Sequence, residues 1–252
     1  MSRFASIAAA REMDGLRMAC LRGVPSPWTE AAKGIFRVKN LDCQYAAQSE
    51  DDADNAIAAW AGNSSVPVVA YQDEPLRTGW SEILMLAERL APRKPLLPAD
   101  FEGRTTVIGI AHELCGEMGL GWSSRNLLVR QGLAEGPKAG FHPKIAQFLA
   151  AKYGYREDED YAGRMVSILT GLSERIAGRA FLVGDTLTAA DIYWAAFSNL
   201  VSPLDEACMP MNPHMRTSWE AVPTAIRAAA SPELMAHRDR IYDAYLELPV
   251  PL

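Results

Sequence analysis

The chain has 252 residues, of which 49% are hydrophobic and 22% are charged, so it can form one or two globular domains with a sizeable core. Its formal net charge of −6 disfavours nucleic acid or an anionic membrane as the main partner, because both attract basic patches. No apolar run approaches the roughly 20 residues that span a bilayer. The four scattered cysteines fit free thiols in a reducing compartment.

The first part of the chain alternates between strand and helix patterns. The segment Met1–Ala10 has no apolar signal-peptide core, and we interpret it as a flexible or loosely docked leader of a cytoplasmic protein. Ser26-Pro27 is typical of a helix start, with a capping residue followed by proline in the first turn. The predicted strands cover residues 16–21, 41–46, 66–71 and a short stretch around 76–77, and the predicted helices cover 26–38, 51–61 and 79–90.

Three prolines, Pro92, Pro95 and Pro98, then predict a stiff linker that cannot continue a helix. Beyond it the apolar spacing is helical, and it predicts a domain boundary between residues 14–91 and 99–252. Apolar residues at helical spacing run from Val107 to Met118, with several glycines that close packing or a cleft floor would explain. Further helices are expected over residues 161–176 and from Ser231-Pro232 to about residue 245.

The most specific pattern is the stretch from Gly184 to Trp194. Thr188 and Asp191 have the spacing of a capping box, in which each residue satisfies an amide of the other at a helix start. The residues that follow are apolar on nearly every side, which indicates a buried helix. A buried helix needs its first amides satisfied internally, so we expect Asp191 to be a structural carboxylate at the start of a central core helix.

This Gly-Asp turn with its capping box resembles the C-terminal domain of cytosolic glutathione transferases. The strand and helix order βαβαββα, with Val66-Pro67 opening a strand, resembles the thioredoxin-like N-terminal domain of the same family. The resemblance implies an α/β domain with a cis-proline at Pro67, followed by an all-α domain. It also implies glutathione as the ligand of the first domain and a homodimer.

The Ser26-Pro27-Trp28 sequence looks like the Ser-Pro-aromatic motif of the serine-type classes. The resemblance implies that the Ser26 hydroxyl hydrogen-bonds to the glutathione thiolate and lowers the pKa of the thiol. It implies that Val66, before Pro67, pairs with the cysteinyl part of glutathione. The alternatives are a plain helix cap at Ser26 and an edge-strand proline at Pro67.

The sequence departs from the family pattern at the start of the third helix. The family has an acid followed by serine there, to hold the γ-glutamyl group of glutathione. Here the residues are Thr78, Gly79, Trp80 and Ser81, and no register gives that pair. We expect the helix amides, helped by Thr78 or Ser81, to hold the carboxylate, while Trp80 fills part of the pocket or simply packs.

The resemblance implies an enzyme that brings a glutathione thiolate near Ser26 to a hydrophobic electrophile between the domains. Conjugation, ether cleavage, dehalogenation and isomerisation all remain open. The alternative is a protein of this fold that has lost glutathione chemistry and serves as a binding or structural protein. The histidines and cysteines show no metal-ligand spacing. The side chains proposed to line the second-substrate pocket, with core packing as the alternative for each, are Met118, Trp122, Trp219 and the methionines from Met209 to Met215.

Overall fold

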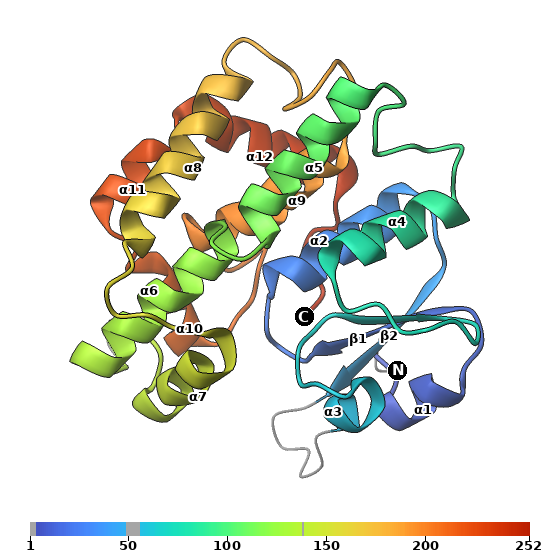
Figure 1. The fold of residues 1–252 in the computed structure, drawn as a ribbon, viewed down its shortest axis with the longest axis horizontal. Helices are drawn as coiled ribbons and strands as arrows, with labels where there is room; N and C mark the ends of the chain where they lie inside the picture. The colour runs from blue at the N-terminus through green and yellow to red at the C-terminus, as the bar shows by residue number, and fades with distance from the viewer. Residues whose placement is uncertain (1–3, 49–55, 138) are drawn as a thin grey trace.

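The computed structural model describes residues 4–48, 56–137 and 139–252 of the chain. A small sheet with helices on both faces comes first, and a set of helices follows it (Figure 1). The elements of the first part are α1 (Ile7–Glu12), β1 (Leu16–Leu21), α2 (Pro27–Val38), β2 (Cys43–Gln48), α3 (Ala56–Ala61), β3 (Val68–Tyr71) and α4 (Trp80–Leu90). Five residues of the helix predicted over 51–61 lie outside the described residues.

The sheet has the strand order β2-β1-β3, with β2 parallel and β3 antiparallel to β1. Successive side chains of a strand point to opposite faces, so Met18 joins the core under α2 and α4 while Ala19 joins the one under α1 and α3. In the same way, Val69 of β3 joins the first of these cores and Val68 joins the second. The sheet is thus covered on both faces, and its first strand is buried along almost its whole length (Figure 1).

Two strand predictions need correction. The fourth strand, expected around Leu76-Arg77, is reduced to a single bridge in which Val69 and Arg77 exchange two backbone hydrogen bonds of 2.8 Å. The strand expected from Leu41 begins at Cys43. The Leu41 amide instead donates to the Phe36 carbonyl, because the chain closes the end of α2 through Asn40 at a φ of 54°.

The leader is docked rather than loose over its described part. Ser6 caps α1 by accepting from the Ala9 amide, and Ile7 and Ala10 are buried. Ala5 forms a bridge with Ala46, which extends the sheet at the β2 edge. The prediction of a flexible or loosely docked leader is therefore wrong for these residues, whose apolar side chains fill the small core between α1 and α3.

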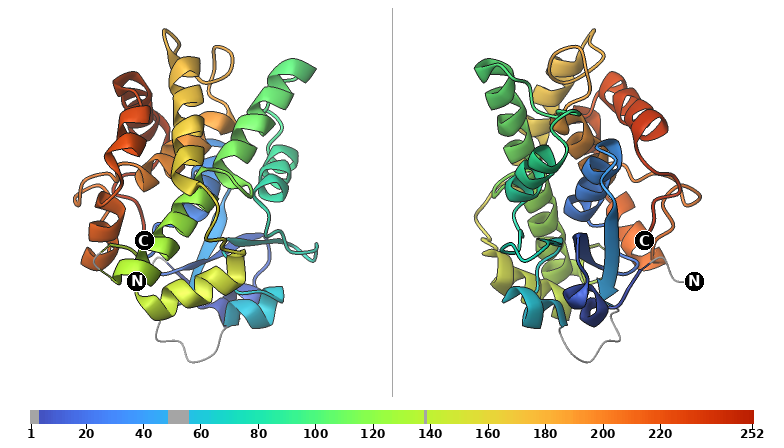
Figure 2. Two further views of the ribbon diagram at one scale, coloured as in Figure 1. Left: turned by 60° about the vertical axis from the view of Figure 1, so that its left-hand side comes forward. Right: turned by 90° about the vertical axis from the view of Figure 1, so that its right-hand side faces the viewer.

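The second part consists of helices packed around α9 (Ala189–Phe197), and Figure 2 shows this set of helices from two sides. Every residue of α9 is buried. The other elements are α5 (Phe101–Cys115), α6 (Leu120–Glu135), α7 (Pro143–Tyr153), α8 (Tyr161–Ile176), the 3-10 turn η1 (Ser198–Leu200), α10 (Pro213–Glu220), α11 (Thr224–Ala229) and α12 (Pro232–Tyr245). Helix α9 packs against α5 and α12, and also against α2 of the first part. The central core helix is confirmed.

The capping box forms with one difference from the predicted pattern. Asp191 accepts from the Thr188 amide at 2.8 Å, but the Thr188 hydroxyl donates to the same carboxylate at 2.9 Å instead of accepting from the Asp191 amide. The other carboxylate oxygen accepts from the Leu182 amide and lies 3.0 Å from Nε2 of His237 on α12. Asp191 is fully buried, so this one carboxylate joins the turn, its own helix and α12.

The linker after α4 is hydrogen-bonded to both parts of the molecule. Lys39 donates to the Lys94 carbonyl and pairs with Glu88, and the Ala189 amide donates to the Leu96 carbonyl at 2.9 Å. One further difference follows along the chain. Met118 lies in the turn between α5 and α6 at a φ of 60°, outside any helix. Helix α7 begins at Pro143, with His142 as its N-cap residue.

Candidate functional site

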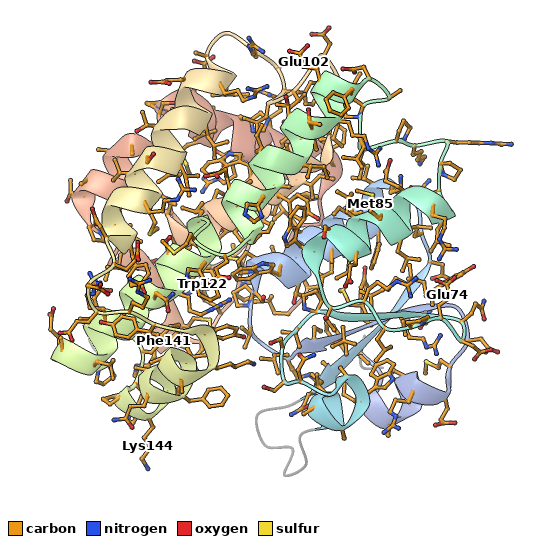
Figure 3. The ribbon with its side chains drawn as sticks, viewed as in Figure 1. Glu74, Met85, Glu102, Trp122, Phe141 and Lys144 are labelled. Carbon is orange, nitrogen blue, oxygen red and sulfur yellow. The ribbon has the colours of Figure 1, made fainter. Side chains whose placement is uncertain are left out.

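A cleft of about 630 Å³ lies between the two parts of the molecule. Ser26, Val66 and Thr78 line it from the sheet side, and Trp122, Arg125 and Tyr153 line it from the helical side. Trp122 is labelled in Figure 3, on α6 beside the first turn of α2. The cleft brings together residues that are widely separated in the sequence, at the amino end of α2.

Ser26 is the N-cap residue of α2, as predicted, with Pro27 in the first turn. Its backbone carbonyl accepts the first helical bond, from the Glu30 amide at 2.9 Å. Its side chain forms no capping hydrogen bond, so the hydroxyl does not play the structural part that the sequence offered as an alternative. The Ser26 side chain is half-buried on the cleft wall, at the positive end of the α2 dipole.

The Val66-Pro67 peptide bond is cis, as the resemblance implied. Strand β3 begins two residues later, at Val68, whose partner on β1 is Ala19. Val66 therefore lies outside the β-ladder and lines the cleft. Its main chain is not used for pairing within the sheet.

Of the four residues proposed at the start of α4, only two line the cleft. Thr78 and Trp80 line the cleft. Gly79 is the N-cap residue, and Ser81 lines a different hollow, with Arg77 and Met85. The structure does not bring Ser81 to the cleft, because one residue along a helix turns the side chain by about 100°.

Glu82, in the first turn of α4, has a role at this helix start that was not predicted from the sequence. Its carboxylate accepts from the Gly79 amide at 3.1 Å and from the Thr78 amide at 3.3 Å. The N-terminus of α4 is thereby capped by an acid of its own first turn. The chain's own negative charge lies where a ligand carboxylate was expected.

Trp80 both packs and lines the cleft. Its ring meets Tyr193 of α9 edge-on at 5.8 Å between centroids, and its carbonyl accepts from the Tyr193 hydroxyl at 3.1 Å. These contacts fix the first turn of α4 against the core helix. Trp80 is thus a fixed wall rather than a mobile side chain of the pocket.

The helical wall of the cleft holds polar residues that the sequence analysis missed. Arg125 of α6 lies over the ring of Tyr153, 3.9 Å from its centroid, and 4.7 Å from the ring centroid of Trp28. Lys152 of α7 donates to the Ser64 hydroxyl at 2.9 Å, next to Val66. The signal that could have revealed them is His142-Pro143 as a helix start, because the His142 side chain accepts from the Lys144 amide and the following residues form α7.

The charges of this wall act on one another. Burial alone would raise the pKa of the Tyr153 hydroxyl, but a hydrogen bond to Ser65 and the nearby charges of Arg125 and Lys152 lower that pKa overall. Burial lowers the pKa of the Arg125 guanidinium from its ordinary value. The cleft therefore offers a hydroxyl and two cations to a bound molecule.

The cysteines nearby are poor nucleophiles. Cys115 lines the cleft, but burial raises the pKa of its thiol well above the ordinary value. Cys20 in β1 is buried, and burial raises the pKa of its thiol to about 11. Neither thiol supplies a thiolate near neutral pH.

Most residues proposed for the second-substrate pocket lie elsewhere. Trp122 lines the cleft, where it meets Tyr153 edge-on at 6.2 Å. Met209, Met211 and Trp219 are buried in the core, and Trp219 borders a separate small hollow against α6. Met118 lines none of the cleft and uses its carbonyl to accept from Arg164. Core packing accounts for Met209, Met211 and Trp219, which belong to the main core of the molecule.

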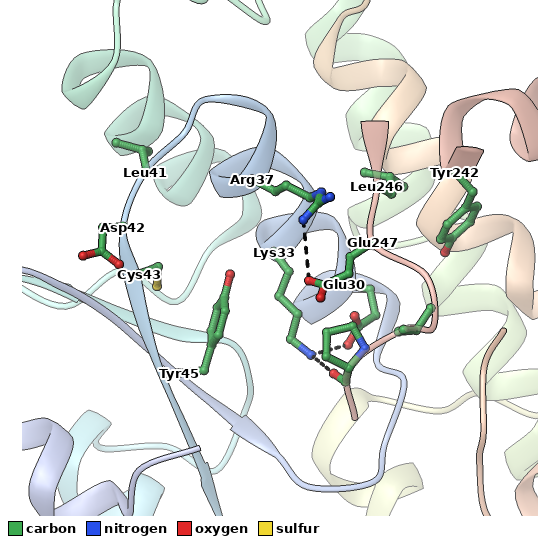
Figure 4. Close-up of a pocket in the computed structure, with 13 residues that line it drawn as sticks. Glu30, Lys33, Arg37, Leu41, Asp42, Cys43, Tyr45, Tyr242, Leu246 and Glu247 are labelled. Atoms are coloured by element: carbon green, nitrogen blue, oxygen red, sulfur yellow. Dashed lines mark hydrogen bonds and ion pairs between the residues drawn. The ribbon is translucent and has the colours of Figure 1, made fainter. Parts of the chain in front are cut away.

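A second hollow of about 230 Å³ lies between α2, β2 and the end of the chain (Figure 4). Lys33 there donates to the Pro251 carbonyl at 2.6 Å and to Glu30 at 2.9 Å, and Arg37 lies 3.8 Å from Glu247. These contacts hold the C-terminal segment against α2. Lys33 and Arg37 of this hollow are therefore used within the protein, unlike Arg125 of the cleft at Ser26.

The fold is that of solved glutathione S-transferases. One from Xanthobacter autotrophicus is 20% identical with a TM-score of 0.57, and the match covers 94% of this chain and 98% of that one. One from Methylobacterium radiotolerans, solved in complex with glutathione sulfonate, is 17% identical with a TM-score of 0.59 and 91% of each chain covered. One from the Antarctic clam Laternula elliptica is 14% identical with a TM-score of 0.60, covering 92% of this chain and 89% of that one.

Residues 141–243 match the family model described as Glutathione S-transferase, C-terminal domain. The helical part of the chain is thus similar to the C-terminal domain of that family. No curated protein matches the chain. As in the family resemblance, a thioredoxin-like domain precedes an all-helical one.

Two further findings concern metal binding and membrane spans. Among residues 4–48, 56–137 and 139–252, no group of three or more His, Cys, Asp or Glu side chains could hold a metal ion. In the same part of the chain, no helix has the length and apolar character needed to cross a membrane.

Proposed function

We propose that the chain is a glutathione transferase in which the Ser26 hydroxyl donates a hydrogen bond to the thiolate of glutathione. The observation that carries the proposal is that Ser26 faces the cleft with a hydroxyl not used for capping. A hydrogen bond to the charged form of the thiol, together with the positive end of α2, stabilises the thiolate and lowers the pKa of the thiol.

Glutathione would lie along the sheet side of the cleft. The main chain of Val66, before Pro67 and outside the β-ladder, is free to pair with the cysteinyl unit. Thr78 and Trp80 border the γ-glutamyl end, with the amides of Trp80 and Ser81 in the first turn of α4 nearby. This placement brings the sulfur towards Ser26.

The chemistry is nucleophilic attack by the thiolate on an electrophilic carbon of the second substrate. With an aryl halide, a C–S bond forms, the C–Cl bond breaks, chloride leaves with the electron pair, and the thiol proton has already gone to solvent. Trp28, Trp122 and Phe148 give the cleft aromatic walls that suit a hydrophobic electrophile. Conjugation, ether cleavage, dehalogenation and isomerisation all begin from the same thiolate.

Glu82 favours a second candidate, a protein of this fold that binds ligands without glutathione chemistry. Its carboxylate caps the amides at the start of α4 and would repel the γ-glutamyl carboxylate. Calorimetry with glutathione separates the two candidates. Absence of binding at millimolar glutathione would rule out the transferase.

The Ser26→Ala variant tests the role of the hydroxyl. We expect kcat/KM with glutathione and 1-chloro-2,4-dinitrobenzene to fall about 10- to 100-fold, with little change in glutathione affinity. The melting temperature should stay close to wild type, because the hydroxyl caps nothing.

Tyr153→Phe is the matched control for Ser26→Ala, since it removes the other cleft hydroxyl with a lowered pKa. A rate that survives Ser26→Ala but falls in Tyr153→Phe would move thiol activation to Tyr153.

The proposal also includes the homodimer and the cytoplasmic location implied by the family. Light scattering after size-exclusion chromatography measures the oligomeric state.

A further inference from the structure

Arg125 is a cation of the cleft that has aromatic neighbours but no acidic one. The rings of Trp28 and Tyr153 lie 4.7 and 3.9 Å from its guanidinium carbon. A guanidinium that stacks on rings keeps the N–H bonds of its edge available to a planar acceptor. The residue is half-buried and lines the cleft.

Other arginines of the helical part are paired. Arg164 lies 2.5 Å from Glu113, and Arg216 lies 2.6 Å from Glu206. Within the described residues, Arg125 forms no ion pair or hydrogen bond. Glu117, the acid that also lines the cleft, is exposed at its rim and pairs with neither Arg125 nor Lys152.

Partial burial of an unpaired cation is costly, as the lowered pKa of Arg125 indicates. Lys152 adds a second positive charge, which lies 5.0 Å from the Tyr153 ring centroid. An anionic ligand would recover this cost through charge-assisted hydrogen bonds. The surrounding rings of Trp28, Trp122 and Tyr153 favour a flat, apolar body on that ligand.

We propose that Arg125 binds the carboxylate of an aromatic second substrate, with Lys152 as a supporting charge. The inference rests on the proposed function in naming the ligand as the second substrate. The second substrate is then an aromatic carboxylic acid with an electrophilic carbon, rather than an uncharged hydrophobic electrophile. This refines the expectation of a purely hydrophobic substrate.

The test compares two aryl halides of equal size, 4-chloro-3-nitrobenzoate and the uncharged 4-chloro-3-nitrobenzamide. Binding of each to the full chain is measured by calorimetry without glutathione, so a failure of glutathione chemistry leaves the result readable. We expect wild type to prefer the benzoate about tenfold or more. Arg125→Met should weaken benzoate binding about 10- to 100-fold and change benzamide binding less than about threefold.

Arg125→Lys keeps the charge but loses the planar fork, and should lie between wild type and Arg125→Met. Arg104→Met, on the exposed surface of α5, removes the same charge away from the cleft and should bind the benzoate like wild type. The proposal is overturned by equal affinity of wild type for the two compounds, or by no benzoate binding at millimolar concentration. It is also overturned if Arg125→Met weakens glutathione instead of benzoate, because the anion would then belong to glutathione.

Discussion

At the scale of single residues, Ser26 and Glu82 have opposite consequences for glutathione. Ser26 leaves its hydroxyl free at the start of α2, where an anion is stabilised. Glu82 places a carboxylate against the amides of Thr78 and Gly79, at the second helix start that borders the cleft. The start of α2 is open to a ligand, whereas at the start of α4 the chain's own carboxylate already accepts from two amides.

Removal of the Glu82 carboxylate should strengthen glutathione binding. We expect Glu82→Ala to lower the Kd for glutathione about two- to fivefold, because the α4 amides and dipole become available to the ligand carboxylate. The same change should cost about 1 kcal/mol of stability through loss of the cap. Calorimetry measures the affinity. Glu82→Gln, which keeps a neutral cap, should lie between the two, and an unchanged Kd in both variants would show that Glu82 does not compete.

At the scale of elements, α9 depends on one buried carboxylate. Asp191 accepts from the amides of Leu182 and Thr188 and from the Thr188 hydroxyl, and His237 of α12 lies at hydrogen-bond distance. All of these groups are removed from water, so each depends on Asp191 for a partner. The carboxylate therefore fixes the turn before α9 and the position of α12 together.

Asp191→Ala should lower the free energy of unfolding by about 3 kcal/mol, because several buried donors lose their acceptor at once. Urea unfolding followed by circular dichroism measures the change. Thr188→Val removes only the hydroxyl and should cost about 1 kcal/mol. A wild-type melting temperature in Asp191→Ala would contradict the structural role of the carboxylate.

At the scale of the whole molecule, Trp28 joins the sheet part to the helical part. It belongs to α2, yet its indole N–H donates to the Cys115 carbonyl of α5 at 2.9 Å, and its ring meets Phe197 of α9 at 4.9 Å between centroids. The same ring lies against Arg125. The junction between the two parts and the proposed carboxylate site therefore share one side chain. The domain division at 14–91 and 99–252 remains a prediction.

Gly121 makes this junction possible. A Cβ atom there would lie 2.5 Å from the Phe197 ring and 2.6 Å from the Trp28 ring. Gly121→Ala should therefore lower stability by about 1–3 kcal/mol and shift the Trp28 fluorescence, because the two rings must move apart. Thermal unfolding monitored by fluorescence measures both. Gly109→Ala on α5, with open space around it, should be neutral or slightly stabilising.

Local features of the sequence were sufficient for much of the fold. The bounds of β1, α2 and α12 follow from apolar runs, from Ser26-Pro27 and from Ser231-Pro232, since strand pattern and capping depend on neighbours in the chain. The predicted helix-start role of Ser26 and the burial of Asp191 were correct for the same reason. The fourth strand was wrong, because only Arg77 bridges to β3, between Pro75, which has no amide to donate, and the start of α4 at Trp80.

The sequence by itself determined the scaffold, through caps, periodic apolar faces and the prolines that interrupt them. Only the tertiary structure decided what the cleft contains. Arg125 meets Trp28 and Tyr153 because α6, α2 and α7 pack at one corner, and no local pattern encodes the contact. Packing also fixes the orientation of α4. That orientation points Ser81 away from the cleft and brings the Glu82 carboxylate to the Gly79 amide. Chemistry at the cleft depends on distances between residues far apart in the chain, and packing sets those distances.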